Sequence, residues 1–247
     1  TDGGASYGYV AKLTAADASV MDYFGQSVAI AGGTIVVGAC YSSGKGAAYV
    51  FRTSDGGTSY VEVAKLTAAD AAMADYFGYS VAIDGNTIVV GAYGDGSGAV
   101  TAGEGSVYVF RTTNGLTYSQ VAKFSATDTA YGDWFGYSVA IDGDTIVAGA
   151  PYKSSRTGAA YVFRTTDGGA TYGYGQVAKL KANDGRVTDL FGWSVAIAGG
   201  TVVVGAHGDD DGGSYSGSAY VFRTSDGGAT YGQVAKLTAT DAAVEDT

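Results

Sequence analysis

The sequence predicts an all-β protein, a β-propeller of four-stranded antiparallel blades. The first observation is a repeat: Phe-Gly recurs at Phe24, Phe77, Phe135 and Phe191. The second is composition, because 41 Gly and one Pro suit short strands joined by tight turns. The third is that no segment shows the 3.6-residue apolar period of a helix. Tandem units of about 40–50 residues or more, with four strands each, are typical of propeller blades.

Each repeat contains four predicted strands, which the second copy shows clearly as "VEVAKLTA", "YSVAI", "TIVVGA" and "SVYVFR". The second of these leads to Asp-Gly or Ala-Gly-Gly, which predicts a tight hairpin. "TIVVGA" is apolar on both faces, as a strand buried between layers should be. We therefore predict one propeller domain over 1–247, with repeats at about 7–60, 61–118, 119–174 and 175–230 and a partial copy at 231–247. Four full repeats and one extra strand allow a four-bladed ring or an excerpt of a larger propeller or array.

A second motif lies between repeats, as "TSDGGTSY" at 53–60, "TTDGGATY" at 165–172 and "TSDGGATY" at 224–231. It resembles the Asp-box hairpin of sialidases and other propellers, in which the carboxylate accepts hydrogen bonds from its own turn. The copy at 112–118 is shorter and carries Asn114. The resemblance supports the fold and not the activity. Sialidase chemistry needs a Tyr nucleophile with a Glu partner and an Arg cluster, and the Glu residues are only Glu62, Glu104 and Glu245.

The Phe-Gly dipeptides, the apolar strand and Gly149-Ala150-Pro151 together resemble FG-GAP repeats, the blades of the integrin α-subunit propeller. Many extracellular proteins carry such repeats, so the resemblance implies an extracellular or cell-surface adhesion or interaction module. In integrin-type blades calcium sits in an Asp-x-Asp-x-Asp-Gly loop between the Phe-Gly and Gly-Ala-Pro strands. Here that connection offers Asp84, or Asp142 with Asp144, and cannot alone supply the six to eight oxygens that calcium takes.

The loops that follow each Gly-Ala differ most between repeats, and variable loops on a regular scaffold usually carry binding. The binding residues that we predict there are Tyr41, Tyr93, Asp95, Tyr152, Arg156, His207 and Tyr215. Tyr and Arg favour protein interfaces, and Tyr can also stack on sugars. The same loops offer one candidate calcium site, Asp209, Asp210 and Asp211. Because consecutive Asp residues do not match the alternating ligand spacing of a calcium loop, we favour a merely solvated acidic loop.

Two Asp residues five apart precede each Phe-Gly, and a further pair lies in the partial copy. The pairs are Asp17 and Asp22, Asp70 and Asp75, Asp128 and Asp133, Asp184 and Asp189, and Asp241 and Asp246. Paired carboxylates could coordinate a cation. Because every repeat has a pair, we favour the structural interpretation, in which they bond to backbone amides of their own loops.

Net charge excludes one class of partner, since a balance of -10 argues against binding nucleic acid. No apolar run reaches the roughly 18 residues of a membrane span. The lone Cys40 cannot form an intrachain disulfide, and the lone His207 has no nucleophile pattern around it.

We predict a non-enzymatic extracellular or cell-surface module that binds a protein partner through its variable loops. One alternative is a structural component of a fibre, wall or filament, self-associated by repeat stacking or strand exchange. A second is a carbohydrate-binding lectin.

Overall fold

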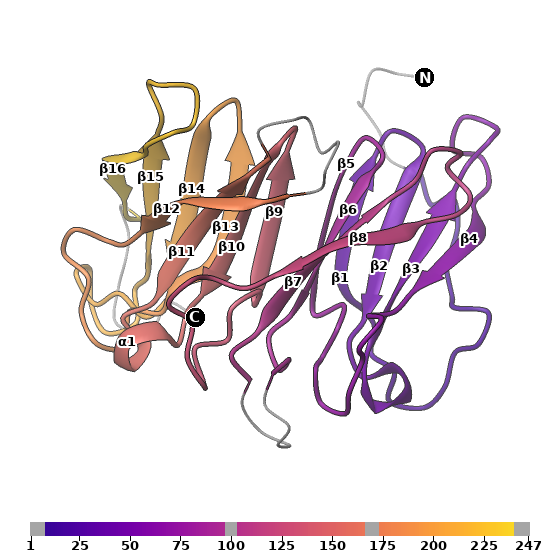
Figure 1. Cartoon of the computed structure of the whole chain (residues 1–247), viewed down its shortest axis with the longest axis horizontal. Coiled ribbons are helices and arrows are strands. Elements are labelled where there is room, and N and C mark those ends of the chain that lie inside the picture. Colours follow the sequence, from indigo (N-terminus) through magenta and orange to yellow (C-terminus); the bar gives the residue numbers. More distant parts are fainter. Residues whose placement is uncertain (1–7, 97–102, 166–172, 240–247) are drawn as a thin grey trace.

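The chain is all-β, as predicted, in a computed structural model that describes residues 8–96, 103–165 and 173–239. Its strands form four antiparallel sheets of four strands each (Figure 1). The first two are β1 (Phe24–Ala31), β2 (Thr34–Ala39), β3 (Ala47–Arg52), β4 (Val61–Leu66), then β5 (Ser80–Asp84), β6 (Thr87–Ala92), β7 (Ser106–Arg111), β8 (Ser119–Phe124). The last two are β9 (Ser138–Asp142), β10 (Thr145–Ala150), β11 (Ala159–Arg164), β12 (Gly175–Leu180), then β13 (Phe191–Ala198), β14 (Thr201–Ala206), β15 (Ser218–Arg223), β16 (Gly232–Leu237).

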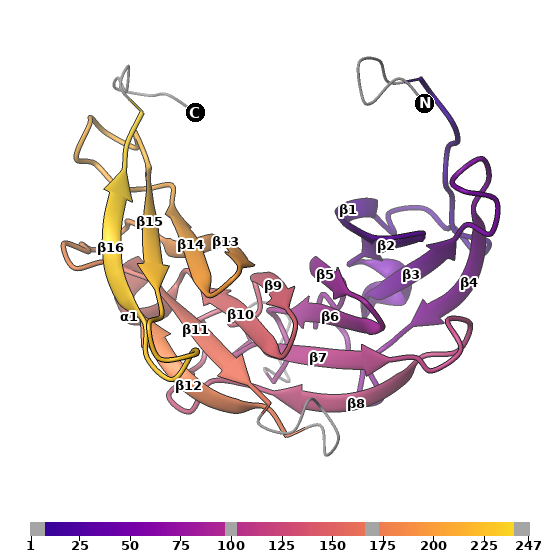
Figure 2. The ribbon, with the colours of Figure 1, turned by 90° about the horizontal axis from the view of Figure 1, so that it is seen from above.

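The sheets stand side by side like propeller blades around an open arc (Figure 2). The first strand of every sheet lies on the inner side of the arc and the fourth strand on the outer side. The first and last sheets lie at opposite ends of the arc, so the four blades do not close a ring. Of the two arrangements left open by the sequence, the described residues therefore form an arc of blades rather than a four-bladed ring.

The sheets group the strands differently from the sequence repeats. The segment Val61–Leu66, which opens the second repeat, is the outer strand of the first sheet. The strand left over at the C-terminal end, β16, completes the fourth sheet. The equivalent segment 10–13 forms no strand. A blade therefore begins at Phe-Gly and ends with the Val-Ala-Lys strand of the following repeat.

The hydrophobic core lies between neighbouring sheets. Phe77, Phe135 and Phe191 are completely buried, and each packs edge-on against a Tyr and a Phe of its own third strand. Every residue of the central strands β6 and β10 is buried, which confirms the prediction for "TIVVGA". In β14 burial alternates, because no described sheet packs on the face of the fourth blade that points away from the third blade.

Neighbouring blades approach so closely that a side chain is excluded at the Gly of Gly-Ala. A Cβ on Gly91 would lie 1.9 Å from the carbonyl oxygen of Gly136 in the next sheet. The same carbonyl accepts a hydrogen bond of 2.8 Å from Ser80 Oγ, and the other two junctions repeat this bond. The Phe-Gly and Gly-Ala signatures thus mark the two sides of each blade contact.

One short helix, α1 (Lys153–Arg156), follows the third Gly-Ala. No helix among the described residues is long and apolar enough to cross a membrane.

Candidate interaction face at the Gly-Ala end

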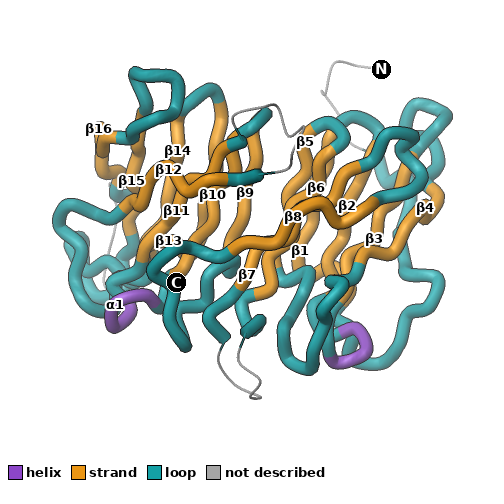
Figure 3. Tube along the Cα trace, in the orientation of Figure 1, coloured by secondary structure: helices purple, strands orange, loops and turns teal. Residues whose placement is uncertain are grey.

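The loops of the arc gather at the two ends of the strands (Figure 3). We call one of these the Gly-Ala end, because each second strand finishes there at Gly-Ala. It carries the loops between second and third strands, with α1 among them, and the segments that lead into each Phe-Gly. The opposite end, which we call the hairpin end, carries the Asp-Gly turns and the Asp-box hairpins.

The segments that lead into Phe-Gly have a strained backbone. Positive φ alternates with ordinary φ over five residues, so that in the second blade Ala74, Tyr76 and Gly78 have φ of 65°, 56° and 89°. Tyr23 and Trp134 occupy the position of Tyr76, with φ of 54° and 60°. The left-handed conformation costs a bulky residue about 1–2 kcal/mol. Such strain is found where surrounding structure or function demands it.

A buried carboxylate holds each strained turn. Asp75 is 3% exposed, and its Oδ2 accepts a hydrogen bond of 2.6 Å from the backbone N–H of Ala72. Asp22, Asp133 and Asp189 make the same bond in the other blades. The structural interpretation of the second Asp is thereby confirmed for the four pairs that the structure describes.

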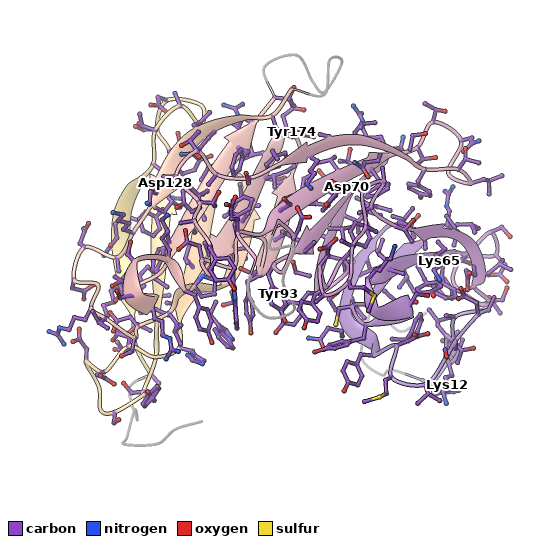
Figure 4. The ribbon with its side chains drawn as sticks, turned by 60° about the horizontal axis from the view of Figure 1, so that its bottom comes forward. Lys12, Lys65, Asp70, Tyr93, Asp128 and Tyr174 are labelled. Carbon is purple, nitrogen blue, oxygen red and sulfur yellow. The ribbon has the colours of Figure 1, made fainter. Side chains whose placement is uncertain are left out.

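The strained residues and their neighbours build a continuous band of rings across the four blades. We call it the aromatic belt, and it comprises Tyr23, Tyr41, Tyr76, Tyr79, Tyr93, Trp134, Tyr137, Tyr152, Trp193 and His207. Successive ring centroids lie 3.8 to 5.0 Å apart, the shortest being Trp134 to Tyr152. In Figure 4, which brings this end forward, Tyr93 is seen near the middle, with Lys65 to one side and Asp128 to the other.

Some rings of the belt are buried and hydrogen-bonded, whereas the rings of the first blade are exposed. Tyr137 is 9% exposed, and its Oη accepts a hydrogen bond of 2.8 Å from Tyr79 Oη. Burial raises the pKa of Tyr93 and of Tyr137 above the usual value, so both hydroxyl groups stay neutral. Tyr23 and Tyr41, in contrast, are 50% and 41% exposed, and the exposed side chain of Met73 lies against the same loop.

The structure places four of the seven predicted binding residues in this belt: Tyr41, Tyr93, Tyr152 and His207. Arg156 lies beside it, with its guanidinium 5.3 Å from the centre of the Tyr152 ring. Asp95 is buried instead and pairs with Lys123 at 2.7 Å. Tyr215 is exposed and stands apart from the belt, its N–H donating to Asp210.

The sequence analysis missed six rings of the belt. Three stand directly before Phe-Gly and three stand directly after it, namely Tyr23, Tyr76, Trp134, Tyr79, Tyr137 and Trp193. The signal that could have found them is an aromatic residue recurring on both sides of the dipeptide.

The first Asp of each described pair bonds to side chains of the sheet that follows it. Asp70, in the loop after β4, accepts hydrogen bonds from Lys123 Nζ at 2.6 Å and from Tyr108 Oη at 3.1 Å, both in the second sheet. Asp17, Asp128 and Asp184 bind the equivalent Lys in the same way, and the first two also bind the equivalent Tyr. We call these four the latch aspartates. The latch belongs to the scaffold, as do the recurrent Lys residues. Asp241 and Asp246 lie outside the described residues.

Charge pairing sets the ionisation of the latch. Burial alone would raise the pKa of Asp128, but hydrogen bonds from Lys179 and Tyr161 outweigh it and lower that pKa below its usual value. The buried turn carboxylates behave oppositely, since burial raises the pKa of Asp75 and of Asp189.

The candidate calcium residues are divided by the structure. Carboxylate oxygens of Asp209 and Asp211 lie within 4.8 Å of one another and of the latch residue Asp184, whereas Asp210 turns to its own loop. The ammonium of Lys236 sits among these three carboxylates, 2.7 Å from Asp184 and 3.1 Å from Asp209. The chain's own cation therefore already occupies the middle of the cluster and offsets part of its negative charge.

The hairpin end is built from polar turns that bond within themselves and to the next blade. Asp84 and Asp142 accept hydrogen bonds of 2.7 Å from the backbone N–H groups of Gly143 and Gly199. Asp55 accepts hydrogen bonds of 2.9 Å from the backbone N–H groups of Thr58 and Ser59, as the Asp-box resemblance implies. Asp226 does the same in the fourth blade, and Asn114 replaces it in the second. The copy at 165–172 lies almost wholly outside the described residues. These turns serve the scaffold.

Comparison with known proteins agrees with this architecture. The family described as "FG-GAP repeat" matches residues 7–51, 60–110, 118–163 and 174–222. A solved structure, Sqt1 of Saccharomyces cerevisiae, is similar in fold at 11% identity with a TM-score of 0.51. The match covers 89% of this chain and 49% of that chain, so the chain spans about half the length of that protein. No curated protein matches the chain.

Proposed function

The chain belongs to the FG-GAP repeat family, and we propose that it is a non-enzymatic module that binds a protein partner through the aromatic belt. Proteins of this family are propeller-type interaction modules and are typically not enzymes. The observation that carries the proposal is the belt itself, partly exposed rings held together by a strained backbone. We place the module outside the cell or on its surface, where FG-GAP repeats are typical.

Composition supports a protein partner for the belt. Tyr, Trp and Met are enriched in the cores of protein interfaces, where their rings give large contact area at low entropic cost. Scattered exposed apolar side chains are normal, whereas a contiguous apolar patch is typical of an interaction site. Met21, Met73 and Val187 are more than 60% exposed and lie in the segments that lead into the belt.

Ring geometry favours protein over sugar. A lectin platform needs free flat ring faces, but Tyr76 and Tyr93 stack on each other at 13°, and Trp193 and His207 stack at 22°. What these rings leave open is their edges. Edges and hydroxyl groups suit contacts with side chains and backbone of a partner.

Capture of cell-surface and secreted proteins on the immobilised chain tests the proposal. Tyr41→Ala with Tyr152→Ala should lose the proteins that the native chain retains, whereas Leu116→Ala should keep them. Leu116 is a matched control because it is 57% exposed at the hairpin end. Retention that is unchanged by the double variant, or belt-dependent signals on a glycan array, would contradict the proposal.

A second candidate function, self-association, rests on the exposed faces at the ends of the arc. Val28 and Ile30 of β1 are 68% and 65% exposed, whereas Val81, which occupies the position of Val28 in the second blade, is 8% exposed. At each of the three junctions between described blades, this face of one blade packs against the facing side of the blade that precedes it in the chain. The fourth blade of another copy would offer that face.

Mass in solution separates the two candidates. If copies associate end to end, light scattering should show dimers or longer species that Val28→Asp dissociates into monomers. A monomer at all concentrations would remove this candidate and leave the belt proposal intact.

Calcium at Asp184, Asp209 and Asp211 is the metal proposal that this cluster allows, with Lys236 displaced by the ion. A ligand that binds only the native state raises its melting temperature. A higher melting temperature in calcium chloride than in chelator, lost in Asp211→Asn, would support the site. Equal melting temperatures would exclude it.

A further inference from the structure

One position of the Gly-Ala loops varies between the blades. Three residues after the Ala of Gly-Ala stand Ser42, Asp95, Lys153 and Asp209. In the second and fourth blades the carboxylate at this position pairs with the Lys of the fourth strand, Asp95 with Lys123 at 2.7 Å and Asp209 with Lys236 at 3.1 Å. These Lys side chains thus bind a carboxylate from this loop in addition to the latch aspartate.

The first blade lacks that second carboxylate. Ser42 takes its place, so that among the described carboxylates Lys65 pairs with the latch residue Asp17 alone, at 2.6 Å. A cavity of about 290 Å³ opens beside Ser42, between the first and second blades. Its lining includes Ser42, Ser43, Lys45, Lys65 and Thr67.

The cavity has a surplus of positive charge. Lys65 and Lys45 both line it, and the lining contains no acidic side chain. Lys45 is exposed and forms no ion pair with any carboxylate that the structure describes. The hydroxyl of Ser42 lies 3.5 Å from that of Tyr49, and both are buried. Lys65 and Tyr49 already bond to Asp17, so what the cavity offers a ligand is the exposed ammonium of Lys45, the remaining donors of Lys65 and the hydroxyl of Ser42.

We propose that this cavity binds a carboxylate group supplied from outside the chain. The second and fourth blades show the expected mode, since there a carboxylate at the same position accepts from the same Lys. In the fourth blade it also accepts a hydrogen bond of 2.8 Å from the Tyr equivalent to Tyr49. A charge-assisted hydrogen bond of this kind is roughly twice as strong as a neutral one.

In the third blade a residue of opposite charge occupies this position. Lys153 extends from the loop to the buried turn carboxylate Asp133 at 2.7 Å and fills the position. Of the four blades, only the first therefore leaves this position open among the described residues. Since ligand cavities usually measure about 300–1,000 Å³, the volume suits a single acidic group rather than a large cofactor.

Titration with sodium acetate, followed by amide NMR, tests the inference. The amides of Ser42 and Gly46 should shift saturably in acetate and not in sodium chloride at equal ionic strength. Ser42→Asp supplies the missing carboxylate from the chain, so it should abolish these shifts and raise the melting temperature by about 1–3 °C. Lys45→Ala should weaken acetate binding about two- to fivefold, because it removes one exposed cation.

A second probe separates the sources of the group. N-acetyl-aspartate amide presents an acidic protein side chain, whereas acetate presents a free small carboxylate. Tighter binding of the first assigns the cavity to an acidic residue of a partner, and equal binding assigns it to small carboxylates. Shifts that are equal in chloride, or that persist unchanged in Ser42→Asp, would overturn the inference.

Discussion

The loops at the two ends of the strands are stabilised in different ways. At the hairpin end, Asp55 and Asp226 accept hydrogen bonds from the amides of their own turns, and Asp84 and Asp142 accept from the backbone N–H groups of Gly143 and Gly199 in the next blade. At the Gly-Ala end, bulky residues such as Tyr76 and Trp134 hold left-handed backbone, and their rings are joined across blades. The difference indicates that the hairpin end serves the scaffold. At the Gly-Ala end the strained backbone lowers the stability of the fold and holds aromatic side chains where a partner can reach them.

The largest effect should come from a methyl group at a blade junction. Gly91→Ala places its Cβ against the Gly136 carbonyl, which is backbone and cannot turn away. We expect a loss of about 3 kcal/mol or more in the free energy of unfolding, or failure to fold. Gly85→Ala at the hairpin end meets no atom within 4 Å, and its φ of 52° should limit the loss to about 1–2 kcal/mol. Urea denaturation measures both, and equal losses would contradict the close approach of the blades.

A medium effect should come from the latch. Asp128→Asn removes the partner of Lys179 and should lower the free energy of unfolding by about 1 kcal/mol at pH 7, because the carboxylate is nearly half exposed and screened by water. The pKa of Asp128 is lower in the folded chain than in the unfolded one, so its contribution is fully present above the unfolded value of pH ~4 and is lost as pH falls through the lower folded value. The native and variant stabilities should therefore converge only below the folded pKa of Asp128. A difference that persists in strong acid would contradict the ion pair.

The smallest effect is expected at the hairpin end. Asp55→Asn keeps the oxygen that accepts from Thr58 and Ser59, and the second blade already uses Asn114 in this way. The melting temperature should therefore hardly change, whereas Asp55→Ala should lower it measurably. An equal drop in both variants would show that the charge of Asp55, rather than its acceptor oxygen, stabilises the turn.

The fold could be predicted because its causes recur. Four copies of Phe-Gly, an apolar strand and Gly-Ala each follow from one blade contact, and repetition makes them visible. The grouping of strands could not be predicted, because Val61–Leu66 reads the same whether it opens one blade or closes another. The pairing of this strand with β3 across a long hairpin decides which blade it belongs to.

The candidate site was predicted only in part. Tyr41, Tyr93, Tyr152 and His207 stand in variable loops, where binding residues are expected. Tyr76 and Trp134 were missed because a bulky residue rarely adopts positive φ, so turn chemistry gives no reason to expect their rings there. Asp95 was assigned to binding because its partner Lys123 is far from it in the sequence. One lies in a loop and the other in a strand, and only the folded sheet brings them together.

One measurement tests most directly whether the strained backbone serves binding. Trp134→Gly and Thr188→Gly both relieve a left-handed residue, with φ of 60° and 78°, but only the first removes a ring of the belt. The account predicts that Thr188→Gly retains the captured partner proteins with unchanged affinity, whereas Trp134→Gly loses them while remaining folded. Equal retention by both variants would contradict the central claim that the Gly-Ala end is the interaction face.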